Sequence, residues 1–194
     1  TIRDGLIISI AETTVETAVD LDLSEYTCLP GLINTHVHFD ANPEDAADYG
    51  VYARRTRDDN LALILRNAAT TVHTGFTTVR HAGAWFPDTL ALARAKIDAG
   101  TAIGPRIQSA GPYLTIPGGG GDLTFPEIPI DKIPAESQQG IATTPRQFAE
   151  RAKTAINKGA DFLKVIASGA VFSTGTEPGA PEMYQDDIEA VVAV

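Results

Sequence analysis

The sequence predicts an α/β fold in which strands and helices alternate, and three observations support this prediction. After Pro30, four strand-like runs are each followed by a segment with helical spacing of its apolar residues. A glycine separates a helix from the next strand three times, at Gly75, Gly100 and Gly159. The long connections all follow strands, at residues 40–57, 111–143 and 168–184.

This alternation predicts a parallel sheet with right-handed crossovers. Long loops at the carboxyl ends of the strands are typical of a (β/α)8 TIM barrel, whose sites lie at that face. A complete barrel takes ~250 residues, whereas this chain has 194 residues. We therefore expect residues 31–194 to form the first four βα units of a barrel, with a small open sheet as the alternative.

The individual elements follow from local signals. Strands are expected over residues 32–38, 76–80, 106–110 and 161–167, and helices over about 58–74 and 88–99. A third helix has the clearest start, because Thr144 can cap it, Pro145 fits the first position and Gln147 would complete a capping box. A fourth helix should start near Gln185.

Residues 1–30 hold only short β-like runs. One of them, residues 6–10, follows the turn signal Asp4-Gly5, and another covers about 18–23. These runs are too few for a domain, so we expect them to belong to a small sheet that other chain segments complete.

Composition limits the classes of partner. Hydrophobic residues make up 43% of the chain and charged residues 21%, with a net charge of −10, as in ordinary soluble proteins. The sequence has no long run of lysine and arginine, so we do not expect nucleic-acid binding. It has no apolar run that approaches the ~20 residues of a membrane span. The single cysteine, Cys28, excludes an intrachain disulfide. A cytoplasmic protein is expected, with a removed leader left open because the chain starts at Thr1.

Two histidines end the first strand. Alternation along a strand places Leu32, Asn34, His36 and His38 on one face. Two imidazoles at positions i and i+2 aim at one point, which suits two nitrogen ligands of a metal ion. The same pattern also fits two ordinary polar residues on a partly exposed strand, although the strand as a whole reads as buried.

Lys164 lies in the middle of an apolar strand, so we expect its side chain to be buried. A buried ammonium is costly unless it is paired or deprotonated. Near divalent metal ions, a neutral lysine amine can take up carbon dioxide and become a carbamate ligand. Alternatively, the side chain extends to the strand end with Asp161 as its partner.

Three stretches carry a family resemblance. Residues 30–38 (PGLINTHVH) resemble the first-strand signature of the amidohydrolase superfamily, and GFTTVR at 75–80 and GADFLK at 159–164 are similar to its second and fourth strands. The resemblance is closest to the imidazolonepropionase-like and prolidase-like group, which includes Xaa-Pro and Xaa-Arg dipeptidases or carboxypeptidases and ochratoxin amidases. It implies that residues 1–30 form part of a β-sandwich and that the chain is the N-terminal half of the enzyme.

The resemblance also implies roles for residues. His36, His38 and a carbamate on Lys164 would hold two divalent ions, with zinc as the expected metal. Two further histidines and the catalytic aspartate would lie beyond residue 194. The implied reaction is amide hydrolysis by a metal-bridging hydroxide, on a small-molecule or dipeptide substrate with a C-terminal amino acid.

Several expectations remain alongside this one. The alternatives are hydrolysis of a cyclic, imidazolone-type amide and a non-catalytic structural or binding protein of the same fold. We expect a homo-oligomer, with the C-terminal half of the enzyme as the other part of each subunit. His81, Ser168 and Gly169 follow strands and are candidate substrate-binding residues by position. The glycine run at residues 118–121, within the stretch 117–122, lacks the lysine of a phosphate-binding loop and is expected to be part of a lid.

Overall fold

The computed structural model describes residues 2–3, 6–10, 21, 23 and 25–194. The chain divides into two compact units, Thr1–Pro30 and Gly31–Val194. In the first unit, β1 (Ile2–Arg3) pairs antiparallel with β2 (Leu6–Ile7). The expected turn at Asp4-Gly5 and most of the expected run at 18–23 lie outside the described residues. Membership of a β-sandwich stays a prediction.

The second unit contains the parallel sheet that the sequence predicts. Its strands β3 (Leu32–Val37), β4 (Phe76–His81) and β5 (Arg106–Ser109) pair in sequence order, and both pairs are parallel. A further parallel pair joins β6 (Tyr113–Leu114) to β7 (Lys164–Val165). The mixed α/β class with a parallel sheet is therefore confirmed, whereas closure into a barrel stays a prediction.

The fourth strand is shorter than expected. Only Lys164–Val165 of the predicted 161–167 is a strand, and its partner β6 was not predicted. One reason is the Asp161 carboxylate, which accepts a hydrogen bond from the Ser109 backbone N–H at 2.8 Å. This side chain takes a donor that a regular ladder would give to a backbone carbonyl.

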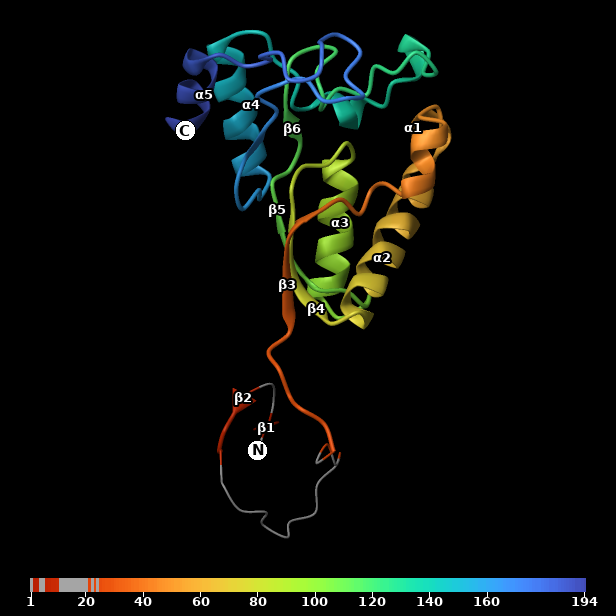
Figure 1. Cartoon of the computed structure of the whole chain (residues 1–194), viewed down its shortest axis with the longest axis vertical. Coiled ribbons are helices and arrows are strands. Elements are labelled where there is room, and N and C mark those ends of the chain that lie inside the picture. Colours follow the sequence, from red (N-terminus) through yellow and green to blue (C-terminus); the bar gives the residue numbers. More distant parts are fainter. Residues whose placement is uncertain (1, 4–5, 11–20, 22, 24) are drawn as a thin grey trace. The chain divides into compact units, whose positions relative to one another are not determined.

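Two helices lie side by side against the three-stranded sheet, α2 (Arg57–His73) and α3 (Pro87–Asp98) (Figure 1). The core between these layers is aliphatic and contains Ile64, Ala68, Val79, Leu90 and Ile107. Because β3 has β4 as its only strand neighbour in the described chain, its start is open: Leu32 is 50% exposed and Ile33 64%. The expectation of a fully buried first strand is therefore wrong.

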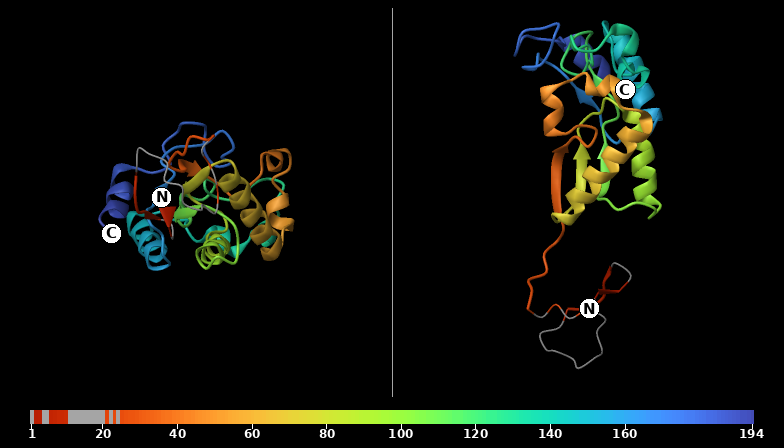
Figure 2. Two further views of the ribbon diagram at one scale, coloured as in Figure 1. Left: turned by 90° about the horizontal axis from the view of Figure 1, so that it is seen from below. Right: turned by 90° about the vertical axis from the view of Figure 1, so that its right-hand side faces the viewer.

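Two other helices, α4 (Pro145–Asn157) and α5 (Gln185–Val192), pack on each other beside β6 and β7 (Figure 2). Short helical segments complete the connections: η1 (Pro43–Ala47), α1 (Val51–Arg54), η2 (Ile130–Lys132) and η3 (Ala135–Gln138). No helix in the described part of the chain is long and apolar enough to cross a membrane.

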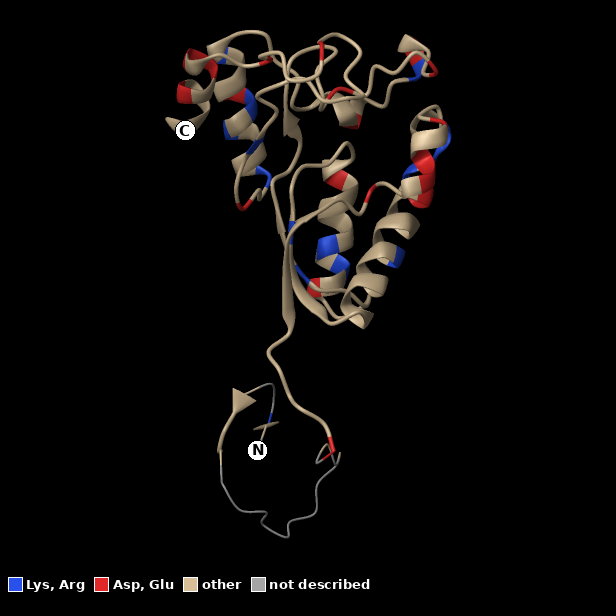
Figure 3. Cartoon of the chain, viewed as in Figure 1, with Lys and Arg blue, Asp and Glu red and all other residues tan. Residues whose placement is uncertain are grey.

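The helix ends follow their capping residues. Thr144 accepts from the Gln147 N–H as expected, but the Gln147 side chain accepts from Thr143 instead of Thr144, so the expected capping box does not form. Helix α2 is capped by Thr56 with Asp59, just before the expected start. Acidic residues mark the first turns of α2 and α5 (Figure 3), where they complement the helix dipole.

Candidate functional site

The two histidines of the first strand face each other. Strand β3 carries His36, and His38 follows at its carboxyl end. Their Nε2 atoms are 3.1 Å apart. This separation is a hydrogen-bond distance, and it is also compatible with one ion at ~2.0–2.1 Å from each nitrogen, as in zinc sites. The strand geometry thus places two potential ligand atoms around one point, as the alternation of side chains predicts.

A hydrogen bond at Nδ1 fixes the tautomer of His38. Its Nδ1 lies 3.0 Å from the Gly83 carbonyl oxygen, which can only accept, so in the neutral imidazole Nδ1 carries the proton and Nε2 has the lone pair. The Tyr113 hydroxyl is 2.9 Å from the same Nδ1. Gly83 has φ +101°, and a Cβ there would lie 2.4 Å from the Tyr113 ring, so this support requires glycine.

The electrostatics favour a neutral His36. Partial burial lowers the pKa of His36, and the neighbouring His38 and Lys164 lower it further. A neutral imidazole is the form that binds metal. Lys164 on β7 is partly buried, less than the sequence suggested, and it lines the same pocket as His38. The fold therefore gathers the three predicted metal ligands, and their role as ligands stays a prediction.

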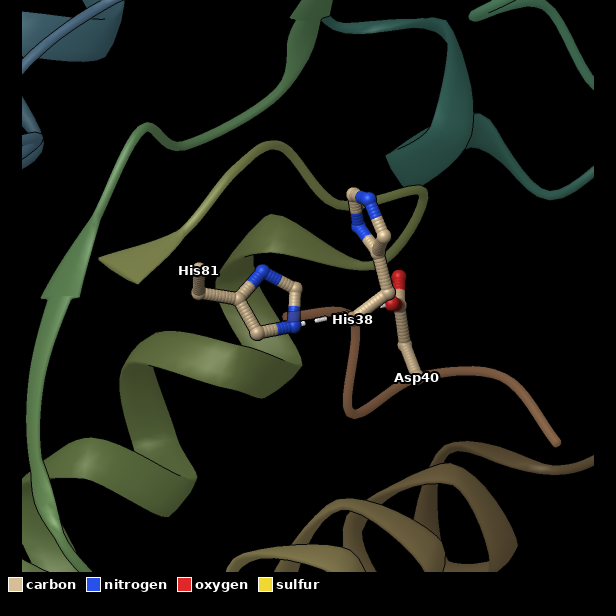
Figure 4. Close-up of side chains that lie close together, drawn as sticks. All are labelled: His38, Asp40 and His81. Atoms are coloured by element: carbon tan, nitrogen blue, oxygen red, sulfur yellow. Dashed lines mark ion pairs between the residues drawn. The ribbon is translucent and has the colours of Figure 1, made fainter. Parts of the chain in front are cut away.

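Two buried groups lie beneath His38, and Figure 4 shows their side chains together. His81, at the end of β4, is fully buried, and its Nε2 accepts a hydrogen bond from the Phe39 N–H at 2.8 Å. Asp40 is 1% exposed and accepts from the Trp85 N–H at 2.8 Å. Burial and the nearby His38 lower the pKa of His81 to about 3, so His81 is neutral. Its substrate-binding role stays a prediction, and its side chain does not line the pocket described below.

His38, Asp40 and His81 form a second group that could hold a metal ion, with ligand atoms within 4.8 Å of one another. Their hydrogen bonds argue against that use. The Nε2 lone pair of His81 is already taken by the Phe39 N–H, so His81 offers no free lone pair at this nitrogen. The His36 and His38 Nε2 atoms therefore fit a metal better than this cluster does.

A pocket of about 350 Å³ adjoins His38 and Lys164. Its lining includes five aromatic side chains, Tyr49, Tyr52, Trp85, Tyr113 and Phe172. These rings come from the loop after β3, from the end of the β4–α3 connection, from β6 and from the loop after β7. The long connections that follow the strands thus build the pocket walls, as the loop lengths suggested.

Ser168 and Gly169 contact other parts of their own loop. Ser168 forms an isolated antiparallel bridge with Pro181, and the Gly169 N–H donates to the Ala180 carbonyl at 2.8 Å. Neither residue is among those that line the pocket. Their suggested contact with a substrate carboxylate stays a prediction.

Sequence reasoning missed Glu182, which is 3% exposed. Its carboxylate accepts from the Gly120 N–H at 3.0 Å and from the Thr115, Ser173 and Thr176 hydroxyls at 3.3, 3.3 and 2.8 Å. It therefore joins the glycine-rich loop to the loop after β7. Both loops contribute to the pocket, through Gly120 on one side and Phe172 on the other.

Strand β3 ends in a pair of histidines, and the connections that follow the strands build a pocket beside them. The protein therefore falls in the class of α/β proteins with a candidate site at the carboxyl ends of parallel strands. Comparison with known families identifies the family. The sequence matches the Amidohydrolase family over residues 27–194, and the chain belongs to this family.

Individual relatives agree with this assignment. The chain is 24% identical over 177 residues to ochratoxinase from Aspergillus niger, covering 84% of this chain and 36% of that protein. A solved amidohydrolase has a TM-score of 0.73 at 26% identity, covering 93% of this chain and 44% of that one. A Xaa-Pro dipeptidase with bound methionine has a TM-score of 0.68 at 28% identity, covering 84% and 40%. The chain thus spans less than half the length of these relatives.

Proposed function

We propose that this chain supplies part of the active site of a metal-dependent hydrolase that cleaves amide bonds in peptide-like substrates. The observation that carries the proposal is the pair of Nε2 atoms of His36 and His38, 3.1 Å apart beside a pocket. The likeness to a Xaa-Pro dipeptidase and to ochratoxinase supports an amide substrate. A C-terminal amino acid on the substrate is part of the proposal.

The residues of this chain divide the work as follows. His36 and His38 would hold the metal through Nε2, and Lys164, as a carbamate, would add an anionic ligand. When bound, a divalent metal ion polarises the scissile carbonyl and lowers the pKa of the attacking water. Gly83 and Tyr113 position His38 by engaging its Nδ1 at 3.0 and 2.9 Å. Such second contacts typically raise metal affinity by orienting the ligand.

The rest of the machinery is proposed to come from chain outside these 194 residues. By the family resemblance this includes two histidines and the aspartate that would transfer protons. We also propose that closure of the half-barrel depends on that chain, and that the enzyme forms a homo-oligomer.

The test combines metal analysis with an amidase screen of the full-length protein. Wild-type protein should contain stoichiometric divalent metal and hydrolyse N-acyl amino acids or dipeptides, and a chelator should abolish activity. His36→Asn and His38→Asn should each lose most bound metal and activity. His73→Asn is the matched control, because His73 is exposed at the end of α2. A wild-type protein that hydrolyses amides without metal would refute the proposal, and a metal-free protein inactive on every amide would favour the non-catalytic alternative.

A further inference from the structure

The pocket beside His38 contains a continuous set of aromatic rings. Tyr113 lies 5.8 Å from the His38 ring, Trp85 lies 6.0 Å from Tyr113, and Tyr52 lies 4.7 Å from Trp85, all between ring centroids. The set continues through Phe125 and Tyr49, which stack at 4.1 Å with an interplanar angle of 11°. It ends at Phe172, 6.5 Å from Tyr49. Tyr113, Trp85, Tyr52, Tyr49 and Phe172 of this set line the pocket, whereas Phe125 packs behind them and does not.

The inner part of this wall is buried and held by hydrogen bonds. The Trp85 ring Nε1–H donates to the Gly121 carbonyl at 3.1 Å, and its backbone N–H donates to Asp40 at 2.8 Å. Tyr52 is 2% exposed and Trp85 8%. Rings held in this way present a preformed surface, which lowers the entropic cost of binding a flat group.

The outer part of the wall is open. Phe172 is 38% exposed, although its ring lines the pocket and faces other rings. An aromatic side chain exposed at the mouth of an aromatic pocket gains contacts when a ligand ring covers it. The neighbouring Val171 is 88% exposed and does not line the pocket.

The pocket offers little to a charged group. Among the lining residues that the structure describes, only His38 and Lys164 can be cationic, and both belong to the proposed metal centre. Asp40 is the one lining carboxylate, and its Oδ2 is occupied by the Trp85 N–H. A volume of about 350 Å³ lies at the small end of the ~300–1,000 Å³ of ligand sites, which suits one aromatic ring or a fused pair.

We infer that this pocket binds an uncharged aromatic group attached next to the scissile amide, with the ring packed between Trp85 and Phe172. This inference rests on the proposed amide hydrolysis and adds the chemical class of the group. The substrate carboxylate, if present, would then point away from these rings, because they provide no cation for it.

The experiment uses the full-length enzyme and matched amides. One series compares N-benzoyl-, N-cyclohexanecarbonyl-, N-(4-carboxybenzoyl)- and N-acetyl-glycine. The other series places the corresponding phenyl, cyclohexyl, 4-carboxyphenyl and methyl groups on the nitrogen of an acetamide. In whichever series is hydrolysed faster, the neutral aromatic compound should exceed the cyclohexyl compound in kcat/KM by roughly 2- to 12-fold, the range for aromatic pairs. The carboxylated ring should be the poorest of the ring-bearing substrates.

Variants locate the effect. Phe172→Ala should lower the ratio of kcat/KM for the benzoyl over the acetyl compound, mainly through KM, and Phe172→Tyr should restore most of it. Val171→Ala is the control and should leave the ratio unchanged. Equal rates for benzoyl and cyclohexyl compounds, or a ratio insensitive to Phe172→Ala, would overturn the inference while leaving amide hydrolysis intact. A wild-type enzyme that hydrolyses none of the amides would overturn both.

Discussion

Removing the carboxylate of Glu182 should release the glycine-rich loop from the loop that follows β7. In Glu182→Ala the Gly120 N–H and the fully buried Thr115 hydroxyl lose their shared acceptor. Thr115 retains a weak alternative, the Ile116 carbonyl at 3.4 Å, whereas no other acceptor for the Gly120 N–H is described. A buried donor without an acceptor costs about 1–3 kcal/mol. The Gly120 N–H bears this full cost, and Thr115, which keeps a weak acceptor, adds about 1 kcal/mol, so the total is about 2–4 kcal/mol.

The cost is local, so hydrogen exchange is the appropriate assay. If opening of these loops exposes the Gly120 amide, a loss of 2–4 kcal/mol accelerates its exchange by roughly 30- to 700-fold. Glu182→Gln keeps one carbonyl oxygen as acceptor and should cost about 1 kcal/mol, or roughly fivefold in exchange. Glu177→Gln removes the same charge from an exposed position of the same loop and serves as the control.

The outcome distinguishes a structural link from a passive buried group. If Glu182→Ala exchanges at Gly120 no faster than the control, the carboxylate does not hold the two loops together. The same variant should also raise KM for pocket-filling substrates, because both loops line the pocket.

Further outcomes follow from other contacts. Lys164→Ala should lose most metal and activity in the full-length enzyme, with partial rescue by added propionate, and wild-type metal content in this variant would refute the bridging carbamate. Arg55→Met should destabilise the loop before α2, because Arg55 donates two hydrogen bonds to Asp45 at 2.6 and 2.8 Å. Burial alone raises the pKa of Asp45, but Arg55 and the Asn42 N–H lower it below its usual value. The stabilisation is therefore present above the unfolded pKa of ~3.9 and lost as the pH falls through the lower folded value. Urea unfolding at pH 7 and pH 3 should show a larger penalty for Arg55→Met at pH 7.

Local signals predicted the elements whose ends depend on neighbouring residues. Thr144 and Pro145 fix the start of α4 within four residues of sequence, and the structure places it there. Strand β6 was missed because Tyr113–Leu114 lies between Pro112 and a glycine run, and only its pairing with β7, some fifty residues later, makes it a strand. A different long-range contact, the hydrogen bond from the Ser109 N–H to the Asp161 carboxylate, lies at the start of the predicted fourth strand, where the structure has no strand.

The residues of the candidate site also divide into those that local signals predicted and those that depend on long-range contacts. Alternation along one strand predicted that His36 and His38 face a common point. Asp40 continues that alternation and was available as a signal, but its partner, the Trp85 N–H, comes from a different βα unit. Glu182 has no local signal at all, because its donors come from residues 115–120 and 173–176.

Asp40 and His81 form a buried pair next to His38, and burial favours the uncharged form of both. Asp40 Oδ1 and His81 Nε2 are 3.7 Å apart, a distance at which a charged pair would attract. Burial raises the pKa of Asp40 and lowers the pKa of His81, so the same desolvation favours the neutral form of both groups. The Phe39 N–H already occupies the His81 lone pair, which fixes the chain immediately after His38. His81 therefore holds the end of β3 in place through Phe39, and the proposed metal ligands, the Nε2 atoms of His36 and His38, lie 3.1 Å apart at the same end of the strand.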